Sequence, residues 1–178
     1  GSDYSAAVLA FCLDVDKLSI WKDVPGVLNA DPRQFPDAVL LPSISFHEAI
    51  EMSFYGAKVI HPKTIKPLHN KRIPLHVRSF IDPESEGTII AEEASNFDLP
   101  PVIVYRAEQV LLSFSVKDFS FVGAENLSII YRELGKQRLH LNMMHNGAIS
   151  FSASLDNKPL KIKALIEALK DDFDILAN

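Results

Sequence analysis

The stretch Tyr55-Gly56-Ala57-Lys58-Val59-Ile60-His61-Pro62-Lys63-Thr64 is the most informative part of this chain for its fold. Gly56 follows an apolar-periodic segment, and glycine commonly ends a helix because it accepts a positive φ. Pro62 suits the first turn of a new helix, where its missing N–H costs no hydrogen bond. We therefore predict that one helix ends at about residue 55 and that another runs over 62–70.

Outward from this stretch, the first 80 residues alternate between helical and strand-like patterns. Ser45 and Glu48 have the spacing of a capping box, which starts the helix at 45–55. A helix is expected at 2–13, with Ser2 or Asp3 as its cap. Strands are expected at 18–21 and 75–80, with a loop at 24–36 that Pro and Gly interrupt. This mixture indicates an α/β domain.

Residues 82–101 are acidic and rich in turn-forming residues, which marks a domain boundary. Beyond them the pattern is strand, helix, strand, strand, helix, strand. The strands are predicted at 109–116, 138–144, 148–155 and 173–176, and the helices at 122–134 and 159–169. This βαββαβ order is the ferredoxin-like plan, with both helices on one face of an antiparallel sheet.

Composition and charge limit the classes of function. The 178 residues are 47% apolar and 23% charged, as in one or two soluble globular domains. The net charge of −5 disfavours nucleic acid as a partner, although small anions remain possible. Apolar runs are too short for a membrane helix. Cys12 is the single cysteine, so no disulfide can form within the chain, and we expect a buried thiol there.

Three segments together resemble aspartokinases in order and spacing. They are Gly1-Ser2-Asp3-Tyr4-Ser5-Ala6, Trp21-Lys22-Asp23-Val24-Pro25-Gly26-Val27-Leu28-Asn29-Ala30-Asp31-Pro32-Arg33, and the stretch quoted at the start. The resemblance implies the C-terminal half of an amino-acid kinase (carbamate-kinase-like) domain, followed by a ferredoxin-like ACT regulatory domain. The expected divisions are an ATP-binding part at 1–90, a linker at 91–103 and an ACT domain at 104–178.

The resemblance also implies an activity. Aspartokinases use ATP to phosphorylate the β-carboxylate of L-aspartate, the first step towards lysine, threonine and methionine. The transition state spreads negative charge over oxygens, so the enzyme needs positive potential and Mg²⁺ rather than a nucleophilic side chain. The Lys-Phe-Gly-Gly-Thr-type segment and the second ACT domain of these cytoplasmic enzymes do not occur in this sequence. We therefore expect these residues alone to be inactive.

The resemblance assigns the site residues of the first half. Nucleotide contact is expected at Lys22, Asp23, Leu28, Arg33, Lys58 and Val59, with Lys58 also catalytic, and contact with aspartate at Ser2 and Asp3. The planar fork of an arginine suits phosphate. Without the motifs, Lys22 and Asp23 would be interpreted as an exposed pair at the end of a strand, and the segment that contains Arg33 as a solvated turn. Lys58 would be interpreted as a charge that stabilises the end of a helix. The six histidines have no metal-ligand spacing, so no protein metal site is predicted.

In the second half, the resemblance implies that an amino-acid effector, lysine or threonine, binds between two ACT domains of a homodimer. The residues expected to contact it are Gly123, Ala124, Asn126, Leu127, Leu141 and Asn142. The alternative is that the apolar positions are simply core and that the module only dimerises. Lysine-sensitive relatives commonly have acidic residues near the positions of Asn142 and Ala148, which would pair with the ammonium group of the effector. Neither residue is acidic here, which makes lysine less favourable as the effector.

Other classes of function remain open at this stage. The chain could be a stand-alone amino-acid-sensing subunit, although such a sensor has no need of the nucleotide loop at 21–33. It could belong to a fusion of aspartokinase with homoserine dehydrogenase. It could also be a kinase of glutamate or acetylglutamate, which the ACT-like half makes less favourable.

Overall fold

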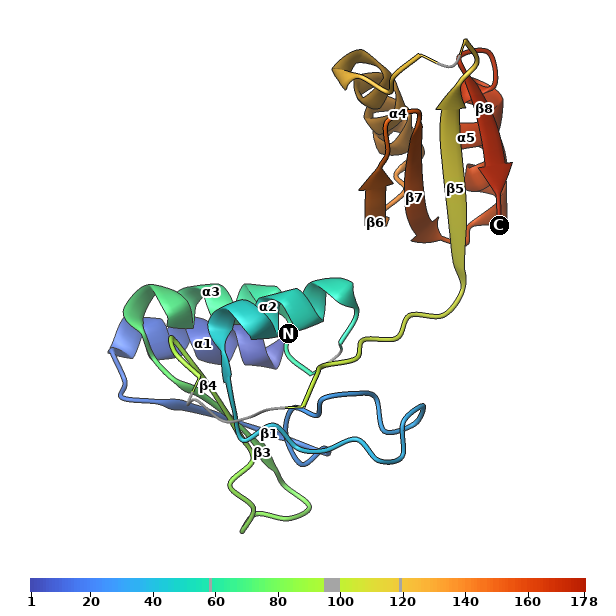
Figure 1. The fold of residues 1–178 in the computed structure, drawn as a ribbon. Helices are drawn as coiled ribbons and strands as arrows, with labels where there is room; N and C mark the ends of the chain where they lie inside the picture. Colours follow the sequence, from blue (N-terminus) through green and yellow to red (C-terminus); the bar gives the residue numbers. More distant parts are fainter. Residues whose placement is uncertain (58, 95–99, 119) are drawn as a thin grey trace. The chain divides into compact units, whose positions relative to one another are not determined.

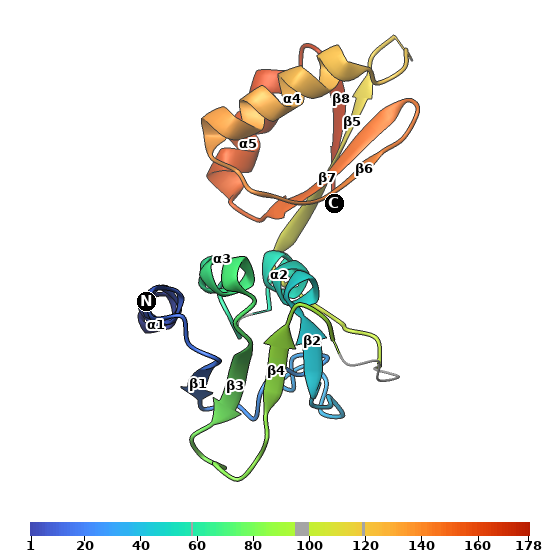
Figure 2. The ribbon, with the colours of Figure 1, turned by 90° about the vertical axis from the view of Figure 1, so that its left-hand side faces the viewer.

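The computed structural model describes residues 1–57, 59–94, 100–118 and 120–178. The chain divides into two compact units, Gly1–Arg106 and Ala107–Asn178. Each unit contains a four-stranded sheet with its helices on one face (Figures 1 and 2). The mixed α/β class predicted from the sequence is confirmed. Among the described residues, no helix combines the length and apolar character needed to cross a membrane.

In the described part of the first unit, three helices lie over a sheet of order β1-β3-β4-β2. The helices are α1 (Ser2–Leu13), α2 (Phe46–Tyr55) and α3 (Pro62–Lys71). The strands are β1 (Leu18–Lys22), β2 (Ser43–Ser45), β3 (Leu75–Ser79) and β4 (Thr88–Ala91). Strand β3 runs parallel to β1 and antiparallel to β4, and β2 runs parallel to β4. Strands β1 and β3 therefore end at the same edge of the sheet.

Sequence reasoning missed β2 and β4 because they have only three and four residues. Strands this short contain too few residues for the alternation of apolar and polar side chains to be recognised. Ile44 and Ile90 are their buried residues on the helix side of the sheet.

The core of the first unit lies between the helices and one face of the sheet. It includes Ala7, Ala10, Ile20, Ile44, Phe46, Ala49, Ile65, Leu68, Leu75, Val77 and Ile90. The small side chains of Ala7 and Ala10 form the buried stripe of α1. Cys12 lies on the opposite side of the same helix and is exposed, so the predicted buried thiol is wrong.

The helix ends agree with the sequence except at α1. The capping box is confirmed: the Glu48 amide donates to Ser45 Oγ at 3.1 Å, and the Ser45 amide donates to Glu48 Oε2 at 2.7 Å. Gly56 follows α2 with φ +126°, and Pro62 begins α3. The N-cap of α1 is Gly1, with no side-chain cap. Ser2 and Asp3 therefore lie inside the first turn, and their predicted capping role is wrong.

The second unit has the predicted βαββαβ order. Its elements are β5 (Gln109–Val116), α4 (Ala124–Gln137), β6 (Leu141–Asn146), β7 (Ser150–Asp156), α5 (Pro159–Leu169) and β8 (Phe173–Ala177). The sheet order β6-β7-β5-β8 is antiparallel throughout, as in ferredoxin-like folds. Both helices cover one face (Figure 2). Arg138 ends α4 with φ +51° rather than starting a strand, which corrects the predicted boundary.

A histidine on β3 predicts a pH-dependent stability of the first unit. Burial, followed by the charges of Lys17 and Arg78, lowers the pKa of His76 below 6.5. Below pH 6.5 the unfolded chain therefore binds more protons at His76 than the folded chain does. The free energy of unfolding is greatest above pH 6.5 and falls as the pH drops below this value.

We expect His76→Gln to lose less thermal stability than the wild type between pH 7 and pH 5.5, as followed by circular dichroism. His47→Gln, at an exposed position of α2, is the matched control for removal of an imidazole. Parallel profiles for His76→Gln and the wild type would rule out this contribution.

Candidate functional site

A pocket of about 430 Å³ opens in the first unit where β1 ends. Its lining comes from the end of β1, the following loop, the end of α2 and a later segment of the chain. The lining residues are Lys22, Asp23, Val24, Gly26, Leu28, Ala30, Asp31, Pro32, Arg33, Met52, Gly56, Ala57, Val59, Ile103, Val104 and Tyr105. The edge where parallel strands end is the usual ligand position in α/β sheets.

The pocket brings together most of the residues predicted to contact nucleotide. Lys22, Asp23, Leu28, Arg33 and Val59 all line it, although the sequence separates the first from the last by 37 positions. Lys58, the predicted catalytic residue, lies outside the described residues. Separate sequence segments thus meet around one cavity.

The loop after β1 is held in shape by pairing with itself. Residues 27–29 lie antiparallel to residues 39–41, with a bridge between Leu28 and Leu40. The Asn29 amide donates to Val39 O at 3.0 Å, and the Leu41 amide donates to Val27 O at 2.9 Å. The pocket wall is therefore an ordered turn of chain.

Thr88 joins this loop to the sheet. The Thr88 side chain is fully buried in β4; Oγ1 accepts from the Val27 amide at 2.8 Å and donates to Leu41 O at 2.7 Å. Gly26 allows this approach, because a Cβ there would lie 2.6 Å from Thr88 Oγ1. One hydroxyl thus anchors both arms of the loop.

Arg33 follows a local turn that the Asp31 side chain stabilises. The Arg33 amide donates to Asp31 Oδ1 at 2.9 Å, the geometry of an Asx turn. The Arg33 side chain is exposed, and it has no hydrogen bond or ion pair with another described residue. Its guanidinium remains available to an anionic ligand.

Lys22 forms an ion pair with Asp3, a residue predicted to contact aspartate. Lys22 Nζ donates to Asp3 Oδ2 at 2.7 Å, and about a quarter of each side chain is exposed. The N-terminus of α1 therefore lies beside the end of β1. Ser2 Oγ is 3.5 Å from Asp3 Oδ1, so the two predicted substrate residues are also adjacent. Sequence reasoning placed these residues in one site but did not predict this ion pair.

The charges on the described pocket lining are balanced. Lys22 and Arg33 contribute two cations, and Asp23 and Asp31 contribute two carboxylates. The described residues contain no group of three or more His, Cys, Asp or Glu placed to hold a metal. The two carboxylates on the lining, Asp23 and Asp31, are the type of side chain that Mg²⁺ prefers as a ligand.

The sequence did not indicate that residues 103–105 line this pocket. Residues 91–103 were expected to be a linker and 104 to begin the second domain, but 100–106 belong to the first unit. The Ile103 amide donates to Asn29 O at 2.7 Å, and Asn29 Nδ2 donates to Pro101 O at 3.2 Å. The only available signal was the apolar run that follows Pro100-Pro101.

The predicted effector residues form two groups in the second unit. Gly123, Ala124, Asn126 and Leu127 lie at the start of α4, whereas Leu141 and Asn142 begin β6 beyond its far end. A 14-residue helix is about 20 Å long, so one chain does not bring the two groups together. Asn126 Oδ1 accepts from the Gly123 amide at 3.0 Å, and Leu127 and Leu141 pack on the core.

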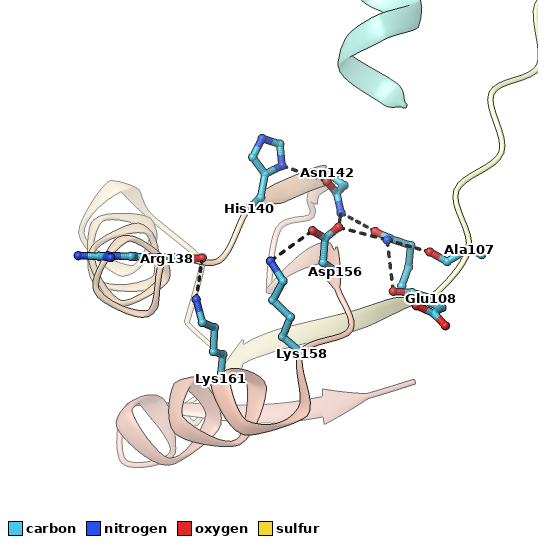
Figure 3. Close-up of polar contacts among 9 residues, drawn as sticks. Ala107, Glu108, Arg138, His140, Asn142, Asp156, Lys158 and Lys161 are labelled. Atoms are coloured by element: carbon cyan, nitrogen blue, oxygen red, sulfur yellow. Dashed lines mark hydrogen bonds and ion pairs between the residues drawn. The ribbon is translucent and has the colours of Figure 1, made fainter. Parts of the chain in front are cut away.

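Asn142 is part of a polar network on the sheet (Figure 3). Its Nδ2 donates to Asp156 Oδ1 at 2.9 Å and also to Gln109 Oε1. His140 Nδ1 lies 3.0 Å from Asn142 Oδ1, and Lys158 Nζ lies 3.6 Å from Asp156 Oδ2. The carboxylate of Asp156, at the end of β7, therefore lies beside Asn142. The sequence pattern did not predict this contact.

Comparison with known proteins shows which family this chain resembles. Residues 1–79 match the amino acid kinase family. Lysine-sensitive aspartokinase 3 of Escherichia coli is 33% identical over 157 residues, which are 88% of this chain and 34% of that protein. A bifunctional aspartokinase/homoserine dehydrogenase of Buchnera aphidicola is 44% identical over 125 residues, which are 70% of this chain and 15% of that protein.

Solved structures agree with this assignment. E. coli aspartokinase III in complex with lysine and aspartate matches with a TM-score of 0.84 and 30% identity, over all of this chain and 41% of that one. The same protein in complex with aspartate and ADP matches with a TM-score of 0.80, over the same shares.

The first unit thus has the fold of part of an amino acid kinase domain. The chain belongs to the aspartokinases, and it spans only 34% and 15% of the length of the two curated relatives described above.

Proposed function

We propose that this chain is the part of an aspartate kinase that binds ATP and senses an amino acid. The convergence of Lys22, Asp23, Leu28, Arg33 and Val59 on one pocket supports the nucleotide role most strongly. In this proposal the product is 4-phospho-L-aspartate, as the resemblance implies, and the protein acts in the cytoplasm.

The side chains of the pocket suit the parts of such a reaction. Arg33 and Lys22 would hold phosphate oxygens, and Asp23 and Asp31 would support Mg²⁺ on the phosphates. Ser2 and Asp3 would contact the aspartate substrate beside them. Mg²⁺ supplies charge neutralisation on the transferred group. Lys58 would stabilise the same charge.

The second unit is proposed to be the ACT domain, which binds lysine or threonine. Because Gly123 and Asn142 lie at opposite ends of α4, an effector that touches both groups requires a second copy of the chain. A homodimer through these units would provide it. The effector role of Gly123, Ala124, Asn126, Leu127, Leu141 and Asn142 rests on this arrangement.

The Buchnera relative gives one observation in favour of a second candidate, the kinase part of a fusion with homoserine dehydrogenase. Both candidates require the same nucleotide pocket. They differ only in what the longer protein contains beyond it.

The proposed activity is tested in a longer protein that contains this sequence and has the length of its aspartokinase relatives. We expect ADP formation that depends on aspartate and not on glutamate or acetylglutamate. Lys58→Ala should lower kcat by about 100-fold, the scale for one lost group that stabilises transition-state charge. The 178-residue chain alone should show no turnover.

Lys63→Ala, at an exposed position of α3 outside the pocket, is the matched control and should keep full activity. Unchanged kcat and KM in a folded Lys58→Ala protein would contradict the assignment of Lys58. Turnover that does not require aspartate would contradict the proposed function.

A further inference from the structure

The pocket lining contains one aromatic side chain among its described residues, that of Tyr105. Tyr105 is 57% exposed, and it belongs to neither hydrophobic core among the described residues. Around it, the apolar part of the lining consists of Leu28, Met52, Val59, Ile103 and Val104. The pocket thus offers an open aromatic surface in addition to its charged groups.

The segment that contains Tyr105 is fixed to the pocket at two places. Asn29, next to Leu28, accepts the Ile103 amide at 2.7 Å and donates to Pro101 O at 3.2 Å. On the other side, a Cβ built on Gly56 would lie 3.9 Å from Val104 Cγ1 and 3.8 Å from Arg106 Cδ. Hydrogen bonds therefore hold the backbone before Tyr105 against the loop after β1, and the side chains of Val104 and Arg106 lie close to Gly56.

We propose that Tyr105 is the residue on which the nucleobase of the bound nucleotide stacks. This inference rests on the proposed function of the pocket. Stacking on an aromatic ring suits any base, because every base has a π-face, so Tyr105 would supply affinity more than choice of base. The phosphates would be held separately by Lys22 and Arg33.

The position of Tyr105 also gives the connecting segment a role in binding. Ala107 begins the second unit, only two residues further along the chain. A nucleotide that stacks on Tyr105 would therefore add a further contact to the segment from which the second unit continues. No residue of the three sequence motifs supplies this contact.

The test is calorimetric titration of the chain with ADP and with inorganic triphosphate, which has phosphates but no base. Tyr105→Ala should weaken ADP binding about 10-fold, since stacking contributes this much per base, and leave triphosphate binding unchanged. Tyr105→Phe keeps the ring and should bind ADP like the wild type. Tyr131→Ala removes a similarly exposed tyrosine of α4 in the second unit, outside this pocket, and is the matched control.

The outcomes separate this inference from the proposed function. Equal ADP affinity in Tyr105→Ala and the wild type overturns the stacking role and leaves the pocket assignment standing. Equal weakening of ADP and triphosphate also overturns it, because the loss would then be structural. Absence of ADP binding in the wild-type chain overturns the proposed function and this inference together.

Discussion

Gly87→Ala is expected to destabilise the first unit by about 3 kcal/mol, because neither the backbone conformation nor the space admits a side chain. Gly87 has φ +72°, and a Cβ there would lie 2.1 Å from Val77 O. The obstacle is the backbone of β3, the neighbouring strand, which cannot move aside without disturbing the pairing of β3 with β4. The hairpin therefore depends on a residue without a side chain.

Thermal unfolding followed by circular dichroism measures this effect. For a unit of about 100 residues, the expected loss lowers Tm by roughly 10–20 °C. Glu86→Ala changes an exposed residue of the same hairpin and should leave Tm nearly unaltered. A Gly87→Ala protein with the wild-type Tm would show that the β3–β4 connection is not built as described.

Thr88→Val should cost about 2–3 kcal/mol and weaken ADP binding at the same time. Valine has nearly the shape of threonine, but it can neither accept from the Val27 amide nor donate to Leu41 O. A buried donor that loses its acceptor costs about 1–3 kcal/mol. Since both bonds hold the loop that carries Leu28 and Arg33, the pocket should lose its shape as well as its stability.

Urea unfolding and ADP titration, carried out on the same protein well below its Tm, separate the two effects. Thr88→Ser keeps the hydroxyl and loses one buried methyl group, so it should cost only about 0.8 kcal/mol and retain ADP affinity. If Thr88→Val binds ADP as tightly as Thr88→Ser does, the hydroxyl does not position the loop.

The sequence predicted the element types well wherever the local signals were strong. The capping box at Ser45, the helix that it starts and the strand at Gln109–Val116 all follow from caps and periodicity within a few residues of the chain. The strands at Ser43–Ser45 and Thr88–Ala91 were missed, because they are defined by their partners in the sheet rather than by their own pattern.

The site was predictable in so far as it consists of motifs. Lys22 and Arg33 lie within one recognisable segment, and the structure places both at the pocket. The Asp3–Lys22 ion pair and the role of Thr88 depend on contacts between segments far apart in sequence. Tyr105 lines the pocket because Asn29 binds a segment that lies more than 70 residues further along the chain. A local sequence pattern cannot predict such a long-range contact.

An NMR titration of the ¹⁵N-labelled chain with ADP shows whether the pocket at the end of β1 binds a nucleotide. We expect saturable amide shifts concentrated at residues 22–33, 56–59 and 103–105. Shifts confined to the groove between α1 and α3, which Tyr4, Val8 and Phe11 line, would contradict it. So would a spectrum that does not change.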